Sequence, residues 1–333
     1  MRPTPREALE SAGLPALLLS NLTNIRYLTG LNLSAGLLLV TARSFILFVD
    51  ARYTEAAEQD AREGIGVRSL DDLENVMKRI ERCGFEEDDV SVARFRRWKT
   101  AFPRTTFVRS SGVIEEFRRS KDDRELSCIR RARKITIELL RRVPAALRAR
   151  TTEKALAWKL QQWARELGAD GLAFDPIVAF GSHSSRPHHR PTLRVLQRGS
   201  VVKIDVGAMY RGYCADLTQV FFAGKPTAIH QKVYRAVEEA RDAAIDAIRE
   251  GVSTAEPDRA AKAVLKKHGI DEAYWYPHAL GHGVGLEVHE GVTLSSSKKR
   301  ARTFLKGEVV AVEPGVYIPG KFGIRLEDTI VVE

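Results

Sequence analysis

The chain has 333 residues, of which 44% are hydrophobic and 29% are charged, a composition typical of globular proteins and not of disordered or collagen-like ones. Its length predicts about two domains. The formal net charge is +10 at pH 7. The longest apolar runs are far shorter than the roughly 20 residues that span a bilayer, which argues against a membrane protein.

The N-terminus has no apolar segment of the kind found in secretory signals, and this favours a cytoplasmic protein. Three cysteines, an odd number without the spacing of metal ligands, predict neither a disulfide framework nor a zinc knuckle: Cys83, Cys128 and Cys214.

The first third of the chain alternates short apolar runs with helical patterns. Content of β-branched and aromatic residues predicts strands at Ile25–Leu28, Leu37–Val40 and Phe45–Val49. Helices are predicted over residues 50–62 and 68–83. This alternation predicts a small α/β domain over residues 1–118, without a convincing catalytic cluster, followed by a second domain over residues 119–333.

A long basic helix is predicted to open the second domain after Ser120. Residues 121–150 hold ten basic and four acidic side chains, and apolar residues recur on one face at helical spacing. A charge run of this kind is typical of a solvated helix face. No nucleic-acid-binding motif accompanies it, so nucleic acid is not the expected partner. Further helices are predicted over residues 152–167, 229–250 and 255–268, with strands between 177 and 220 and strands and loops over the last 60 residues.

A first hairpin carries two aspartates. Val202, Ile204 and Val206 alternate with polar residues, as in a strand. A turn about Tyr210–Arg211 would place Asp205 directly opposite Asp216, with Cβ atoms about 4.5–5.5 Å apart. Like charges at that distance repel, and a bound cation would reverse the effect.

A second hairpin near the C-terminus repeats this arrangement with glutamates. A turn centred on Gly320 would pair Glu313 with Glu327, unless a bulge at Pro314-Gly315 shifts the register by one residue. A single acid pair is more often a solvated surface feature. Four carboxylates within apolar strands, however, would cost many kcal/mol without a compensating charge, so either cations bind them or the predicted hairpins are wrong.

One histidine completes a candidate donor set. His282 lies between Gly281 and Gly283, with Gly285 close by, and these glycines let the backbone approach a partner and leave the imidazole free. A lone histidine is more often a satisfied core residue, but the two acid hairpins favour a ligand. Oxygen donors with one imidazole suit Mn²⁺, Fe²⁺, Co²⁺ or Zn²⁺, and four carboxylates suit two ions about 3.5–4 Å apart.

These motifs together resemble those of the pita-bread metallopeptidases, the family of creatinase, aminopeptidase P, prolidase and methionine aminopeptidase. The similarity covers about residues 121–331 and rests on Asp205 and Asp216, Gly281-His-Gly-x-Gly285, Glu313-Pro-Gly and Arg325-x-Glu327-Asp328. Two N-terminal segments, residues 24–30 and 48–54, resemble the creatinase/prolidase-type N-terminal domain. Methionine aminopeptidases lack that domain, so the resemblance favours a proline-directed peptidase with an α/β (α+β) fold in two domains.

The resemblance also implies roles for individual residues. Five positions match the metal ligands of the family: Asp205, Asp216, His282, Glu313 and Glu327. His188 matches a histidine that contacts the substrate near the scissile bond, although the neighbouring His189 could be that residue instead. His289 matches the second active-site histidine, Arg325 the arginine that supports the last ligand, and Glu313 the base that deprotonates water.

The implied activity is metal-dependent hydrolysis of the Xaa-Pro bond at the N-terminus of peptides by a metal-bridging hydroxide. Two divalent ions are expected, Mn²⁺ first and Co²⁺, Zn²⁺ or Fe²⁺ otherwise, in a homodimer. The alternative is an Xaa-Pro dipeptidase (prolidase), which a positive residue near the proline carboxylate would favour, the candidates being Arg190, Lys298, Lys299 and Arg300. A more distant alternative is a non-catalytic nucleic-acid-binding or scaffold relative.

Overall fold

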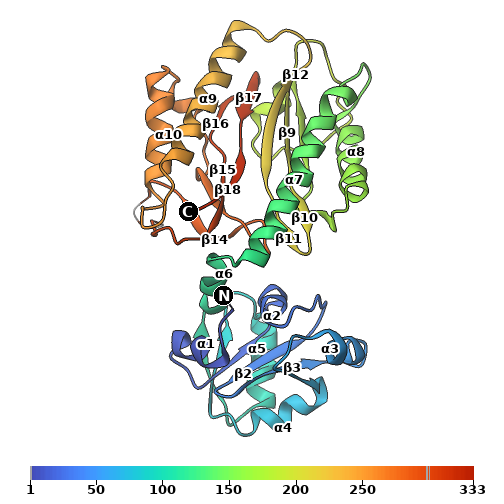
Figure 1. Cartoon of the computed structure of the whole chain (residues 1–333), viewed down its shortest axis with the longest axis vertical. Coiled ribbons are helices and arrows are strands. Elements are labelled where there is room, and N and C mark those ends of the chain that lie inside the picture. Colours follow the sequence, from blue (N-terminus) through green and yellow to red (C-terminus); the bar gives the residue numbers. More distant parts are fainter. Residues whose placement is uncertain (1, 298, 300) are drawn as a thin grey trace. The chain divides into compact units, whose positions relative to one another are not determined.

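The computed structural model describes residues 2–297, 299 and 301–333. The chain divides into two compact units between Arg118 and Arg119 (Figure 1). Among the described residues, no helix has the length and apolar character needed to cross a membrane. Lys298 and Arg300, two of the candidates for binding the proline carboxylate, lie outside the described residues.

The N-terminal unit is an α/β fold built on one sheet with the strand order β4-β3-β2-β1-β5-β6. Strands β1, β2 and β3 are antiparallel neighbours, whereas β4, β5 and β6 add in parallel. Its elements are α1 (Pro5–Ala12), β1 (Ala16–Leu19), α2 (Leu22–Thr29), β2 (Leu37–Thr41), β3 (Ser44–Val49), α3 (Thr54–Asp60), β4 (Ile65–Ser69), α4 (Leu73–Met77), β5 (Arg82–Glu86), α5 (Val92–Ala101), β6 (Thr106–Ser110) and α6 (Val113–Arg119).

Two predictions for this unit were wrong. Residues 25–28 lie in helix α2, because the Asn21 side chain caps the helix by accepting hydrogen bonds from the backbone N–H groups of Thr23 and Asn24. Residues 68–83 do not form one helix. Strand β4 pairs with β3, and β5 pairs with β1 and β6. Pairing within the sheet therefore overrides local propensity and leaves a 3-10 helix at Leu70–Asp72 and the short α4 between these strands.

The C-terminal unit contains two groups of strands, each covered by a pair of helices. Its elements are α7 (Asp123–Ala146), α8 (Glu153–Glu166), β7 (Gly171–Leu172), β8 (Ile177–Phe180), β9 (Val201–Val206), β10 (Ala208–Tyr210), β11 (Tyr213–Cys214), β12 (Leu217–Phe222), α9 (Ala228–Asp246), α10 (Glu256–Lys267), β13 (Gly281–Gly283), β14 (Glu290–Leu294), β15 (Val309–Val312), β16 (Gly315–Ile318), β17 (Phe322–Arg325) and β18 (Asp328–Val331). The predicted α/β class is confirmed for both units.

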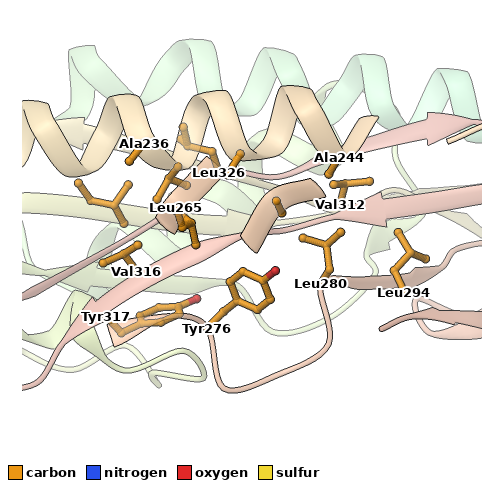
Figure 2. Packing of buried hydrophobic residues seen from close by; sticks show 14 of the residues in the cluster. Ala236, Ala244, Leu265, Tyr276, Leu280, Leu294, Val312, Val316, Tyr317 and Leu326 are labelled. Carbon is orange, nitrogen blue, oxygen red and sulfur yellow. The ribbon is translucent and has the colours of Figure 1, made fainter. Parts of the chain in front are cut away.

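Two large apolar cores hold this unit together, with a smaller third one that includes Val284 and Ala311. Helices α7 and α8 pack Ile135, Leu139 and Leu156 against strands β8 and β9. Helices α9 and α10 pack Ala236, Ala244 and Leu265 against Val312, Val316 and Leu326 of the C-terminal strands (Figure 2).

The basic helix α7 begins later than predicted. Asp122, and not Ser120, is its N-cap, because Asp122 and Glu125 form a capping box. Several of its basic residues have partners in the same unit: Arg133 forms an ion pair with Asp328, and Arg142 forms one with Glu166.

The first acidic hairpin has a different register from the predicted one. Arg211 and Gly212, and not Tyr210 and Arg211, are the central turn residues, and both have positive φ angles of 51° and 82°, as tight hairpin turns require. Asp205 therefore faces Thr218. Asp205 and Asp216 are diagonal rather than direct neighbours, and diagonal side chains on one face still reach each other.

The second acidic hairpin keeps the predicted register. Gly315 pairs with Arg325, and Ile318 pairs with Phe322, about a turn in which Gly320 has a φ of 72°. The two glutamates lie just beyond the paired strands. Glu313 donates its backbone N–H to Leu280, and Glu327 donates its own to Thr218.

Gly207 allows the close backbone approach that brings the two aspartates together. A Cβ atom there would lie 1.9 Å from the carbonyl oxygen of Ala215, which is too close for any side chain.

We expect Gly207→Ala to separate Asp205 from Asp216 and to lower both the melting temperature and the metal content. Gly171→Ala is the matched control, because nothing lies within 4 Å of its added Cβ. Differential scanning fluorimetry and metal analysis check this, and equal effects of the two variants would contradict it.

Candidate metal centre

One cavity of about 560 Å³ in the C-terminal unit brings the predicted site residues together. It lies where the strands beneath α7 and α8 meet those beneath α9 and α10. The residues that line it include every predicted ligand and every predicted catalytic residue: His188, Asp205, Asp216, His282, His289, Glu313, Arg325 and Glu327.

The five predicted ligands form two groups that share one glutamate, and a further group joins Asp216 and His282 to His289. Donor atoms of Asp205, Asp216 and Glu327 lie within 4.8 Å of one another, and so do those of His282, Glu313 and Glu327. Nε2 of His282 is 3.7 Å from Oδ2 of Asp216 and 3.9 Å from Oε1 of Glu313. Because Glu327 belongs to both groups, it would contribute a ligand to an ion held by either group.

Two fully buried carboxylate oxygens in this centre have no hydrogen-bond partner among the described residues. They are Oδ1 of Asp205 and Oδ1 of Asp216. A buried oxygen of this kind is costly unless another group compensates it. The donor set, four carboxylates with one imidazole, fits hard or borderline divalent cations. The residues present therefore fit a pair of metal ions.

The protonation behaviour of the centre follows from burial and mutual repulsion. Burial, with the neighbouring negative charges, raises the pKa values of Asp216 and Glu327 well above their usual range. Burial likewise raises the pKa of Glu313 to about 7. Burial and the adjacent His289 lower the pKa of His282 to about 3, which leaves its nitrogen unprotonated and available as a ligand.

Arg325 supplies a positive charge inside this acidic cluster. Its guanidinium donates to Oδ2 of Asp205, to Oγ1 of Thr218 at 3.0 Å and to the hydroxyl of Tyr317 at 3.3 Å. Thr218 in turn donates to Glu327 at 2.6 Å. Arg325 thus fixes the orientation of ligands and offsets part of their charge.

The two histidines predicted to act on the substrate both face this cavity. The His289 ring packs edge-on against His282, with ring centroids 4.0 Å apart. Burial, and then the nearby His188, lower the pKa of His289. His188 is exposed, and no described residue forms a hydrogen bond with its ring. His189 also lines the cavity, but it is buried, with Nε2 2.9 Å from Oε2 of Glu153.

Three functional candidates were missed at the sequence level. The fully buried Lys203 donates its ammonium to the carbonyl of Arg186 at 2.7 Å, and Tyr317 and His278 lie 3.3 Å apart between hydroxyl and Nε2. Burial lowers the pKa of His278 to about 4. Of these three, only Lys203 could have been recognised from the sequence. It lies two residues before Asp205 in an apolar strand, where a buried lysine needs a hydrogen-bond partner.

Of the four candidates for binding a substrate carboxylate, Arg190 is found at the cavity. Its side chain forms neither a hydrogen bond nor an ion pair with the other described residues. Lys299 is exposed and is not among the cavity residues, and Lys298 and Arg300 are not described.

Comparisons with known proteins agree with this arrangement. The sequence pattern of metallopeptidase family M24 matches residues 127–333, and that of the creatinase/prolidase N-terminal domain matches residues 4–120. An uncharacterized peptidase of Bacillus subtilis is 31% identical over 98% of this chain and 93% of its own.

Two solved structures are similar over nearly the whole chain. An X-Pro aminopeptidase from Thermotoga maritima superposes with a TM-score of 0.89 at 33% identity, covering 98% of this chain and 94% of its own. An Xaa-Pro dipeptidase from Bacillus anthracis superposes with a TM-score of 0.92 at 31% identity, covering 99% and 93%. The pita-bread fold predicted for the C-terminal unit is thereby confirmed, and the chain belongs to metallopeptidase family M24.

Proposed function

We propose that this enzyme hydrolyses the Xaa-Pro bond at the N-terminus of peptides, with residues 119–333 as the catalytic domain and residues 1–118 as the creatinase-like N-terminal domain. The observation that carries the proposal is the pair of donor groups sharing Glu327, with two aspartate oxygens that have no partner among the described residues, in a cavity that His188 and His289 also line. Its relatives include proteins named X-Pro aminopeptidase and Xaa-Pro dipeptidase, which supports proline-directed cleavage.

Five residues would hold two divalent cations: Asp205, Asp216, His282, Glu313 and Glu327. When bound, such ions supply Lewis acidity and lower the pKa of water to near neutrality. Mn²⁺ is our first choice because the set is rich in carboxylates, with Co²⁺, Zn²⁺ and Fe²⁺ as alternatives.

The chain's own residues divide the proton transfers and the charge stabilisation. Glu313, ionised once cations are bound, would accept the proton of the attacking water. His188 would donate a hydrogen bond to the scissile carbonyl oxygen as negative charge develops on it. His289 would deliver a proton to the proline nitrogen, which cannot leave as an anion. Arg325 would hold Asp205 in place throughout.

The choice between aminopeptidase and dipeptidase depends on what meets the carboxylate of the proline. An aminopeptidase must leave room for further residues, whereas a dipeptidase gains from a cation at that position. We favour the aminopeptidase and retain the dipeptidase as the alternative, since Arg190 lines the cavity and forms no ion pair within the described part of the chain. From the resemblance we further propose a cytoplasmic homodimer. The intact donor set disfavours a non-catalytic scaffold or nucleic-acid-binding protein.

Metal removal tests the proposed reaction directly. We expect chelator-treated enzyme to lose hydrolysis and to regain it with Mn²⁺, because the carboxylate cluster requires cations. An Xaa-Pro-Pro tripeptide and an Xaa-Pro dipeptide are to be compared by product analysis. Cleavage of the tripeptide supports the aminopeptidase, cleavage of the dipeptide alone supports the dipeptidase, and cleavage of neither by metal-loaded enzyme contradicts the proposal.

Removal of a single ligand should abolish metal binding and activity together. We expect this of Asp216→Ala and Glu327→Ala, measured by metal analysis and peptide hydrolysis. Asp175→Asn is the control, since Asp175 lines the same cavity but belongs to no donor group among the described residues. An active, metal-free Asp216→Ala enzyme would refute the proposed mechanism.

Metal binding should release protons in mildly acidic solution. At about pH 6 a carboxyl group with a pKa of about 7 is mostly protonated in the metal-free protein, and it must ionise to bind a cation. Affinity for Mn²⁺ should therefore rise between about pH 5 and 7. Titration calorimetry in buffers of different ionisation enthalpy measures the released protons. Glu313→Gln should release fewer, whereas the exposed Glu166→Gln should match the wild type.

A further inference from the structure

Two fully buried ionisable residues hold the segment that carries His188. This segment, residues 186–192, is called the His188 loop below. Glu153 contacts the loop after His188, and Lys203 contacts it before His188. We propose that Glu153 is a positioning residue, which fixes His188 in the active site through His189 and Thr192. This inference rests on the proposed function, in which His188 meets the substrate.

Glu153 is an unusually well-satisfied buried carboxylate. It is the first residue of helix α8, directly after the N-cap Thr152, where the helix dipole favours negative charge. Oε1 accepts hydrogen bonds from the backbone N–H of Phe180 at 2.8 Å and from His183 Nδ1 at 2.9 Å. Oε2 accepts from His189 Nε2 and from both the backbone N–H and the hydroxyl of Thr192, at 2.9, 2.9 and 2.7 Å.

These five bonds make the carboxylate anionic and the two histidines donors. Burial alone would raise the pKa of Glu153, but the hydrogen bonds from His189, Phe180 and Thr192 together lower it to about 2. Because an ionised carboxylate can only accept, His183 Nδ1 and His189 Nε2 each carry the shared hydrogen. The tautomer and ring orientation of His189 are thereby fixed.

The Glu153 cluster differs from the metal centre because both of its carboxylate oxygens accept hydrogen bonds. Glu153, His183 and His189 are close enough to hold an ion. None of their side-chain atoms is among the buried polar atoms left without a partner in the described part of the chain, whereas Oδ1 of Asp205 and Oδ1 of Asp216 are. Hydrogen bonds account for the Glu153 cluster without a cation, so its role is to hold the protein's own groups.

Lys203 completes the support from the other side. Its ammonium donates to the carbonyls of Arg186 at 2.7 Å and Pro187 at 3.3 Å, and it lies 5.1 Å from the centre of the Tyr317 ring. The backbone is therefore held just before His188 by Lys203 and just after it by Glu153. Between these two anchors, the His188 ring has no hydrogen-bond partner among the described residues and lines the cavity.

Fixing His188 in this way lets it act without a reorganisation cost. A hydrogen-bond donor that is already aimed at developing charge stabilises the transition state more than a mobile one does. A misplacement of about 1 Å can cost about 100-fold in rate. Removing the anchor should therefore lower kcat rather than raise KM.

A double-mutant cycle between Glu153 and His188 tests this coupling. Glutamine at position 153 keeps the size but replaces one accepting oxygen with a donor that faces other donors. We expect Glu153→Gln to lower kcat about 10- to 100-fold, with KM nearly unchanged and two metal ions still bound. In the His188→Ala background the same change should have almost no further effect on kcat, and Glu153→Asp should restore part of the activity. Independent, multiplying effects of the two changes would overturn the proposal.

A matched control separates positioning from loss of stability. Asp258 is also a buried carboxylate in the first turn of a helix, where it accepts hydrogen bonds from Tyr276, Ser296 and Lys262. Asp258→Asn should lower the melting temperature as Glu153→Gln does, yet leave kcat within about threefold of wild type. An equal loss of kcat in both variants would reduce Glu153 to a structural residue and overturn the proposal.

A measurement that does not need turnover keeps this inference distinct from the proposed function. Hydrogen–deuterium exchange of residues 181–192 in the metal-loaded protein should be faster in Glu153→Gln than in wild type. Unchanged exchange would overturn the positioning role even if no Xaa-Pro peptide is cleaved. Failure of the wild type to cleave such peptides would instead overturn the proposed function. A third bound metal ion that is lost in Glu153→Gln would also overturn the inference, in favour of a metal site.

Discussion

Mutual repulsion among four buried carboxylates is the constraint on which the catalytic unit depends. Asp205, Asp216, Glu313 and Glu327 line one cavity, and Arg325 contacts two of them. Burial raises the pKa values of Asp216, Glu313 and Glu327, so ionising all four in the metal-free protein is unfavourable. The cluster is consequently a poor way to stabilise a fold and a good way to hold cations, since bound cations reverse the sign of each repulsion.

The two halves of the unit each contribute part of this cluster, and polar bonds join them at the site. Asp205 lies in β9 and Asp216 just before β12, whereas His282 lies in β13 and the two glutamates lie just after β15 and β17. Glu327 donates its backbone N–H to Thr218, and Asp216 donates its own to the hydroxyl of Thr329, both at 3.0 Å. The metal centre and the joint between the halves are therefore the same place, so binding of cations and stability of the fold are coupled.

Buried carboxylates have two different surroundings in this unit. At the metal centre, Oδ1 of Asp205 and Oδ1 of Asp216 lack hydrogen-bond partners among the described residues, and burial with the neighbouring negative charges raises the pKa of Asp216. At Glu153, five hydrogen bonds satisfy the carboxylate, and its pKa falls to about 2. A carboxylate left unsatisfied is one that can bind a ligand, whereas a satisfied one orients its neighbours. This contrast separates residues placed to hold metal from residues that support the His188 loop.

The sequence by itself determined the helices of the catalytic unit, the hairpin register about Gly320 and the residue types of the donor set, because each depends on local periodicity and turn chemistry. It did not determine that residues 25–28 are helical, that Asp205 faces Thr218, or that His189 forms a hydrogen bond with Glu153. Those outcomes depend on a cap, on positive φ angles at Arg211 and Gly212, and on a buried partner 36 residues away in the chain. Only the tertiary structure decided them, because long-range pairing and burial outweigh local preference wherever the two compete.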